Sequence, residues 1–369
     1  MGGLPLICYS CFMITMIFLE KNKIKKTQLS SLLRALALIF IISIILGLKL
    51  GYVEVGWSTI INSLLFKLTG ITTIGLQSED ITVIYELRLP RVLLAAGIGM
   101  GLALSGIVMQ AIVQNPLADP YILGLSSGAS LGATSAIFLG IADIFGVQSI
   151  GISAFLGCLI VSLFIVYLAK TSTHSNNTVK LLLGGMALSA ICSSFSSFIV
   201  YMGSNKQGME SVTYWLMGSV ANARLENVAV LLLIVVIAFI YFSTQSRNLN
   251  LLLLGNEQAI PLGCDMKPVV IKYLVINSIL VGLIVLNSGT IDFVGLVIPH
   301  MVRSILGSNH RKLLPVAVLF GGVFAVMMDI ISRVILNGVE IPLGVTFAMI
   351  GAPCFIYLMT QRRYKFGGN

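Results

Sequence analysis

Long apolar stretches recur along the chain and are separated by short polar segments. They predict ten helices, at about 35–50, 92–113, 121–142, 149–169, 181–202, 227–243, 269–287, 294–307, 314–337 and 343–360. A helix needs about 20 mostly apolar residues to cross the hydrocarbon core of a bilayer. The stretches are continuous rather than alternating with period two, so they indicate membrane-spanning helices and not the strands of a barrel.

Composition supports a membrane protein with several spans. Hydrophobic residues make up 57% of the chain and charged residues 10%, and the mean hydropathy is +0.99. The predicted fold class is therefore all-α and polytopic, with about ten transmembrane helices. We expect a transmembrane domain over residues 34–362, between an N-terminal extension (1–33) and a short tail (363–369).

The positions of lysine and arginine predict the orientation, because cytoplasmic loops carry an excess of both. With ten spans and both ends of the core in the cytoplasm, most of the 23 basic residues fall inside. The net charge of +9 then reflects topology in the cytoplasmic membrane and not nucleic-acid binding. Seven basic residues fall outside: Lys49, Lys67, Arg88, Arg91, Lys206, Arg224 and Arg333.

The first 20 residues leave two interpretations open. The apolar stretch from Leu4 to Leu19 is either an eleventh helix or an over-extended start, since Met13 and Met16 are later start candidates. Cys8 and Cys11 form a C-x-x-C, but a structural metal site needs a second pair of ligands, and the three histidines are isolated. We therefore expect no metal site.

The chemistry of an enzyme is missing from the sequence. No G-x-x-x-x-G-K-[ST] loop occurs, so any ATP and Mg²⁺ must be bound by another chain. No nucleophile elbow or zinc-binding helix is found either. We expect no cofactor on this chain and no catalytic residue.

Polar residues inside the predicted spans are few. Asp329 stands four residues before Arg333, which predicts an ion pair one helical turn apart near a membrane face. Ser189, Ser193, Ser196 and Ser197 form a stripe on the helix that starts near residue 181. The stripe either lines a wet pathway or bonds back to its own helix and permits close packing.

Small residues at four-residue spacing predict close helix contacts. Examples are Gly97 with Gly101, and Gly124 with Gly128 and Gly132.

Several motifs, in order along residues 35–362, closely resemble those of the FecCD family of ABC permeases. They include R-L-P-R at 88–91, M-Q-A-I-V-Q-N-P-L-A-D-P-Y-I-L-G-L-S-S-G-A at 109–129, L-L-L-L-G-N-E-Q-A-I-P-L-G at 251–263, I-D-F-V-G-L-V-I-P-H-M-V-R at 291–303 and E-I-P-L-G-V-T-F-A-M-I-G-A-P-C-F at 340–355. The resemblance implies the ten-helix fold of the cobalamin permease BtuC. It also implies three kinds of partner: a second permease copy or sister permease, two ABC ATPase subunits and an extracytoplasmic substrate-binding protein.

The resemblance also implies roles for individual residues. The loop that couples to the ATPase matches at Gly255, Glu257, Ala259, Leu262 and Gly263, although Pro261 and Asn256 depart from the family pattern. Arg88, Arg91 and Arg333 match arginines that receive glutamates of the binding protein; contact with lipid headgroups is the alternative. Asn115, Leu117 and Thr178 match the cytoplasmic narrowing of the pathway, to which the stripe adds Ser189, Ser193 and Ser196. Asn115 is equally a plain turn former before Pro116.

The function implied is import of an iron(III)–siderophore chelate, with heme, cobalamin or a metal oxyanion as alternative cargo. An ion-coupled secondary transporter is the competing class. It would show inverted repeats, and broken helices with intramembrane acids. The sequence shows neither feature clearly.

Overall fold

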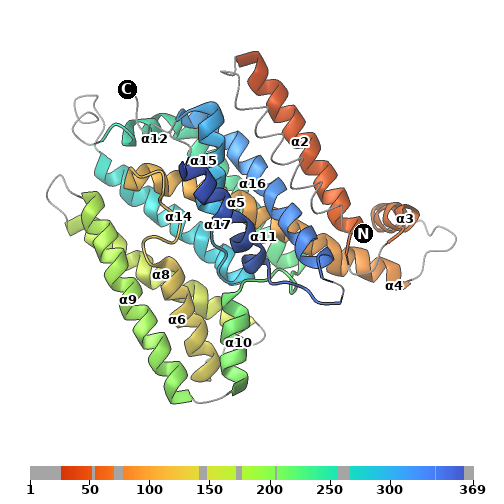
Figure 1. Cartoon of the computed structure of the whole chain (residues 1–369), viewed down its shortest axis with the longest axis horizontal. Helices are drawn as coiled ribbons and strands as arrows, with labels where there is room; N and C mark the ends of the chain where they lie inside the picture. Colours follow the sequence, from red (N-terminus) through yellow and green to blue (C-terminus); the bar gives the residue numbers. More distant parts are fainter. Residues whose placement is uncertain are drawn as a thin grey trace.

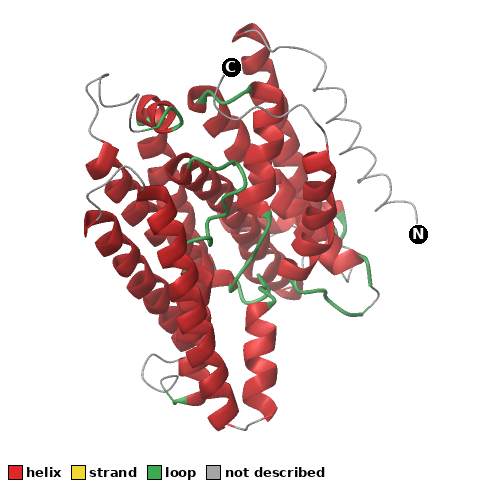
Figure 2. Ribbon diagram, turned by 60° about the vertical axis from the view of Figure 1, so that its left-hand side comes forward, coloured by secondary structure: helices red, strands yellow, loops and turns green. Residues whose placement is uncertain are grey.

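The computed structural model describes residues 26–51, 55–69, 78–140, 148–171, 177–203, 206–255, 266–336 and 338–360. In these ranges the regular structure is entirely helical, and no strand occurs (Figure 2). The elements are α2 (Lys26–Lys49), α3 (Trp57–Thr69), α4 (Ser78–Ile81), η1 (Thr82–Arg88), α5 (Leu89–Val113), α6 (Leu125–Phe138), α8 (Ser149–Thr171), α9 (Asn177–Gly203), α10 (Lys206–Leu216), α11 (Leu225–Thr244), α12 (Ser246–Leu252), α14 (Met266–Ser288), α15 (Val294–Leu306), α16 (His310–Val334) and α17 (Leu343–Thr360).

Each of the ten predicted apolar stretches contains a helix, which confirms the all-α polytopic fold. Eight helices in the described ranges are long and apolar enough to cross a membrane. The other two, α6 with 14 residues and α15 with 13, are shorter than the roughly 20 residues that a full crossing requires. The N-terminal stretch with Cys8 and Cys11 lies outside the described residues.

The prediction of one helix over residues 121–142 is too long at both ends. The helix α6 begins at Leu125 because Gly124 takes a left-handed conformation (φ 84°) that interrupts a helix. Residues 114–124, hereafter the 114–124 loop, are therefore non-helical. Pro120 of this loop packs on Gly295 of α15, beside the carbonyl of Leu102 in α5. The loop therefore folds back between the helices instead of lying beyond their ends.

Three helical segments were not predicted: α3, α4 with η1, and α10. The segment η1 is a π-helix that continues directly into α5, so the two form one helical run from Thr82 to Val113. The helix α10 has apolar residues on one face only, and the search for long apolar stretches passes over such a segment.

The helix α5 is the centre of the fold (Figure 1). In the helical run that contains α5, 89% of an apolar 18-residue segment is buried, whereas the corresponding segments of α16 and α9 are 72% and 17% buried. Figure 1 shows α6, α8, α9 and α10 together on one side and α2 with α3 on the other. Because α5 packs on α16, α15, α11 and α14, its two ends are positioned by several neighbours at once.

Close contacts between helices depend on glycines that face a neighbouring backbone. A Cβ on Gly99 of α5 would overlap the carbonyl oxygen of Gly321 in α16, and a Cβ on Gly321 would overlap that of Gly99. Gly128 of α6 and Gly157 of α8 are related in the same reciprocal way. The small-residue spacing therefore predicted the α6 contact correctly, as expected for membrane helices.

We expect Gly99→Ala to separate α5 from α16, because the added methyl would meet backbone rather than a side chain that can move. Overpacking of this kind costs about 1–3 kcal/mol. The matched control is Gly97→Ala, whose methyl would lie 3.1 Å from Cδ2 of Leu232, the flexible end of a side chain. Thermal unfolding in one detergent should show a clear loss for Gly99→Ala and a smaller change for Gly97→Ala; equal midpoints would contradict this packing.

Candidate functional site

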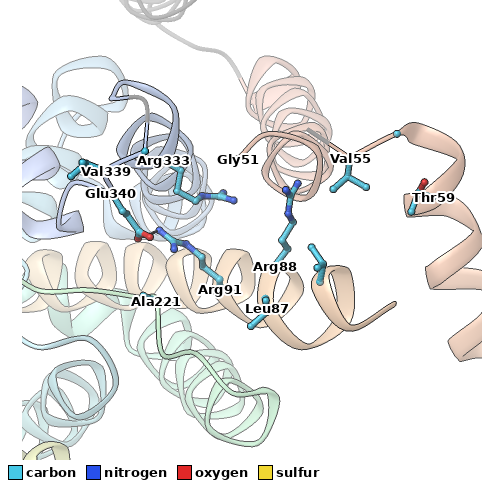
Figure 3. Close-up of a pocket in the computed structure, with 13 residues that line it drawn as sticks. Gly51, Val55, Thr59, Leu87, Arg88, Arg91, Ala221, Arg333, Val339 and Glu340 are labelled. Atoms are coloured by element: carbon cyan, nitrogen blue, oxygen red, sulfur yellow. Dashed lines mark hydrogen bonds and ion pairs between the residues drawn. The ribbon is translucent and has the colours of Figure 1, made fainter. Parts of the chain in front are cut away.

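A cavity of about 730 Å³ opens where the end of α2, η1, the start of α5 and the end of α16 meet (Figure 3). Its lining includes the three arginines predicted to dock a partner, together with Glu340 from the segment before α17. We call it the arginine pocket. Its remaining lining residues are Gly51, Val55, Gly56, Thr59, Val83, Leu87, Ala221, Gly338 and Val339.

Asp329 lies beneath the pocket and binds two of its arginines. Arg91 Nε donates to Asp329 Oδ1 at 2.8 Å, and Arg333 Nη2 donates to Asp329 Oδ2 at 2.7 Å. The Asp329 side chain has no exposed surface. Both carboxylate oxygens are thus used, and the predicted pair with Arg333 is confirmed as part of a larger cluster that ties α5 to α16.

Glu340 is the accessible acid of the pocket. Its Oε1 accepts a short hydrogen bond from Nη2 of Arg91, and 41% of its side chain is exposed against 11% for Arg91. Figure 3 shows the Glu340 and Arg91 side chains pointing toward each other. An acidic group arriving from outside would therefore compete with Glu340 for Arg91.

Arg88 and Arg333 also contact the end of α2. Arg88 Nη1 donates to the carbonyls of Leu48 and Lys49 at 2.7 and 2.8 Å. Arg333 Nη1 donates to the carbonyl of Leu50 at 3.0 Å, and both its terminal nitrogens reach that of Gly47. The last four carbonyls of a helix have no partner within it and carry a partial negative charge, so guanidinium groups satisfy them well.

Arg88, Arg91 and Arg333, to which the family resemblance gives one docking role, all line this pocket and are mostly buried. The docking role itself stays a prediction. Two features were missed: the bond from Arg91 to Asp329 and the role of Glu340. With three cations and two acids the pocket keeps one formal positive charge, which favours an acidic partner.

The proposed pathway residues Asn115 and Leu117 lie in the 114–124 loop. Asn115 Oδ1 accepts from the amide of Leu117 at 2.9 Å, so Asn115 forms the turn that was its alternative role. Leu117 is 38% exposed. The same arrangement recurs four residues later, where Asp119 Oδ1 accepts from the amide of Tyr121 at 2.9 Å.

The serines of the stripe on α9 differ in their exposure. Ser189 lies against Gly124 at the start of α6, whereas Ser193 and Ser197 are exposed. Ser196 is buried, and its hydroxyl has no hydrogen-bond partner among the described residues. Thr178 belongs to the first turn of α9, and its side chain is outside what the structure describes.

Of the predicted coupling residues, only Gly255 is described. It has φ 83°, a left-handed conformation that favours glycine, and it follows the end of α12. Glu257, Ala259, Leu262 and Gly263 lie outside the described residues. What the structure does fix is the anchor of this loop, because Leu249 and Leu252 of α12 are fully buried.

Comparison with known families matches residues 38–361 to the model of the FecCD transport family. The chain belongs to the FecCD transport family. A FecCD chain with helices of this length and composition is an integral membrane permease of the ABC importer class. The family assignment disfavours the ion-coupled secondary transporter that the sequence left as a competing class.

Curated FecCD relatives differ in what their names say they transport. The chain is 39% identical over 291 residues to the cobalamin import system permease protein BtuC of Halobacterium salinarum, covering 79% of this chain and 77% of that one. It is 35% identical to the hemin transport system permease protein HmuU of Yersinia pestis, covering 77% and 84%. It is 34% identical to the molybdate import system permease protein MolB of Haemophilus influenzae, covering 88% and 94%.

A solved structure agrees with the FecCD assignment. It is an ABC transporter assigned to the metal-chelate type, in an inward-facing conformation, and it superposes with a TM-score of 0.77 at 32% identity. The match covers 89% of this chain and 99% of that one.

We expect Asp329→Asn to destabilise this FecCD permease strongly, because Arg91 and Arg333 would lose the buried carboxylate between them. Breaking a buried ion pair costs about 3–5 kcal/mol. Glu340→Gln removes the other carboxylate that binds Arg91, but from an exposed position worth about 1 kcal/mol or less. Thermal unfolding of the two purified variants should rank them in this order, and equal losses would contradict a structural role for Asp329.

Proposed function

We propose that this chain is the membrane-spanning subunit of a binding-protein-dependent ABC importer that carries an iron(III)–siderophore chelate across the cytoplasmic membrane. A second permease copy or sister permease completes the pathway, two ABC ATPase subunits bind ATP and Mg²⁺, and an external binding protein delivers the chelate. The single observation that carries this proposal is the arginine pocket in a FecCD fold. Transport of heme or cobalamin by the same architecture is the alternative.

Docking of the binding protein uses the arginine pocket. The pocket presents arginine side chains at the end of α2. Glu340 already pairs with one of them, Arg91, in the way that an incoming glutamate would. Exchange of Glu340 for a partner carboxylate keeps Arg91 paired throughout, so its buried charge is not left without a partner during docking. Complementary charge also speeds the encounter and makes it sensitive to salt.

At the other end of the fold, the ATPase acts on the segment that follows α12. The residues of this segment that couple it to the ATPase are Gly255, Glu257, Ala259, Leu262 and Gly263. The chelate then passes the narrowing at Asn115, Leu117 and Thr178, along a wall to which Ser189, Ser193 and Ser196 contribute. Both ends of the permease core lie in the cytoplasm in this arrangement, in keeping with the distribution of lysine and arginine.

A docking measurement tests the pocket. Arg88→Gln keeps an amide donor for the carbonyls of α2 but removes the charge, so it should weaken binding of the cognate binding protein about tenfold, or 1.4 kcal/mol. Glu340→Gln should strengthen binding, because it removes the competitor for Arg91. Lys206→Gln, an exposed cation outside the pocket, is the control and should leave the dissociation constant unchanged.

These constants are measured at low salt with the permease–ATPase complex in nanodiscs. Unchanged binding by Arg88→Gln, or weaker binding by Glu340→Gln, would contradict docking at the arginine pocket.

Uptake into proteoliposomes tests the cargo. The complete complex is given, in separate experiments, a ferric trihydroxamate, hemin, cyanocobalamin and molybdate, each with the cognate binding protein outside and ATP inside. We expect ATP-dependent uptake of the ferric chelate and none of the iron-free hydroxamate. Uptake of cyanocobalamin or hemin alone would replace the siderophore assignment while retaining the importer.

A further inference from the structure

The short helix α12 is fixed to the rest of the fold directly before the proposed coupling residues along the chain. It packs on α5 and on α16, and Leu249 and Leu252 are buried in those contacts. Apolar packing alone permits sliding, whereas hydrogen bonds with defined geometry set one position. Such bonds hold α12 to both of these long helices.

The first bond joins α12 to the end of α5. Gln114 Nε2 donates to the carbonyl of Leu252, the last residue of α12, at 3.0 Å. Gln114 is also the residue that ends α5, in a left-handed conformation (φ 53°) uncommon for a residue other than glycine. The 114–124 loop starts here, so a movement of α12 acts directly on the start of that loop.

The second bond joins α12 to the beginning of α16. Asn250 Oδ1 accepts from the backbone amide of His310 at 2.9 Å and lies 2.7 Å from His310 Nδ1. Since this oxygen is an acceptor, the hydrogen of the imidazole is on Nδ1 in this arrangement. The first amides of a helix have no partner within it, and Asn250 supplies one from another element.

The two helices that hold α12 are antiparallel, and their other ends form the arginine pocket. Arg91 is in the first turn of α5, and Asp329 and Arg333 are in the last turns of α16. Between the two ends, Gly99 and Gly321 bring the backbones into direct contact. A pair joined by an ion cluster, by backbone contact and by α12 moves as one body more readily than it deforms.

We infer that α5 and α16 form a rigid strut between the arginine pocket and α12, and that Gln114 and Asn250 are the positioning residues that fasten α12 to this strut. The inference rests on the proposed function, since it needs a binding protein at one end and an ATPase at the other. A strut couples the two sites reciprocally: the nucleotide state changes binding-protein affinity by the same factor by which docking changes nucleotide affinity.

The test measures that factor without any cargo. The dissociation constant of the cargo-free binding protein is determined for the whole permease–ATPase complex, once free of nucleotide and once trapped with ADP and vanadate. We expect the two constants of the wild type to differ by at least about fivefold, the lower end of ordinary allosteric coupling.

Four variants separate the strut from general damage. Asn250→Leu removes the bonds between α12 and the start of α16, and Gln114→Met removes the bond between α5 and α12. Each should reduce the ratio of the two constants to below about twofold, with the nucleotide-free constant unchanged. Asn250→Asp keeps an acceptor oxygen for His310 and should retain the wild-type ratio. Arg247→Gln is the control on the same helix, because the Arg247 side chain is exposed.

The outcomes separate the two hypotheses. If the binding protein fails to bind the wild-type complex in either state, the proposed function is wrong. If it binds with one constant in both states, or if Asn250→Leu and Gln114→Met keep the wild-type ratio, docking stands and the strut is wrong. Copurification of the ATPase shows that each variant assembles; should Asn250→Leu fail to do so, Gln114→Met alone decides.

Discussion

One buried carboxylate organises the end of this permease that contains the arginine pocket. The Asp329 side chain has no exposed surface, and it lies in a bundle of helices that are apolar enough to span a membrane. A buried charge is tolerated when it is paired and hydrogen-bonded, and Arg91 and Arg333 each supply one bond to a different oxygen. Arg333 then extends to the carbonyls at the end of α2, so three helices depend on the same cluster.

The cluster explains how the proposed docking surface can be cationic and still be firmly held. Arginines on long exposed side chains would lose much conformational freedom on binding a partner. Here Arg88, Arg91 and Arg333 are held in advance by carbonyls and by Asp329, and the edge near Glu340 is open to exchange. The structural role and the proposed docking role therefore share the same guanidinium groups, and the substitutions that separate them act at Glu340 and Arg88 rather than at Asp329.

Much of the fold was predictable because hydropathy and charge placement are local properties. The ten apolar stretches became helices, and the Asp329–Arg333 pair followed from spacing on one helix. The second partner of Asp329 could not be found in this way, because Arg91 is 238 residues distant. The ends of α6 depended on Gly124, and α3 and α10 were missed because short helices that are apolar on one face leave only a weak signal. A short turn, such as the one from Asn115 to Leu117, is indicated by the sequence only through the tendency of asparagine to form turns.

The proposed rigidity of the α5–α16 pair can be tested by measuring the distance between spin labels at opposite ends of the pair. Labels at Leu87→Cys and Arg311→Cys, both exposed, mark the arginine-pocket end of the helical run from Thr82 to Val113 and the end of α16 next to α12. A second pair, Leu87→Cys with Leu183→Cys, relates the same point to α9. Between the nucleotide-free and the ADP–vanadate-trapped complex, with native cysteines replaced, the first distance should stay constant while the second changes. A first distance that changes as much as the second would show that α5 and α16 move separately.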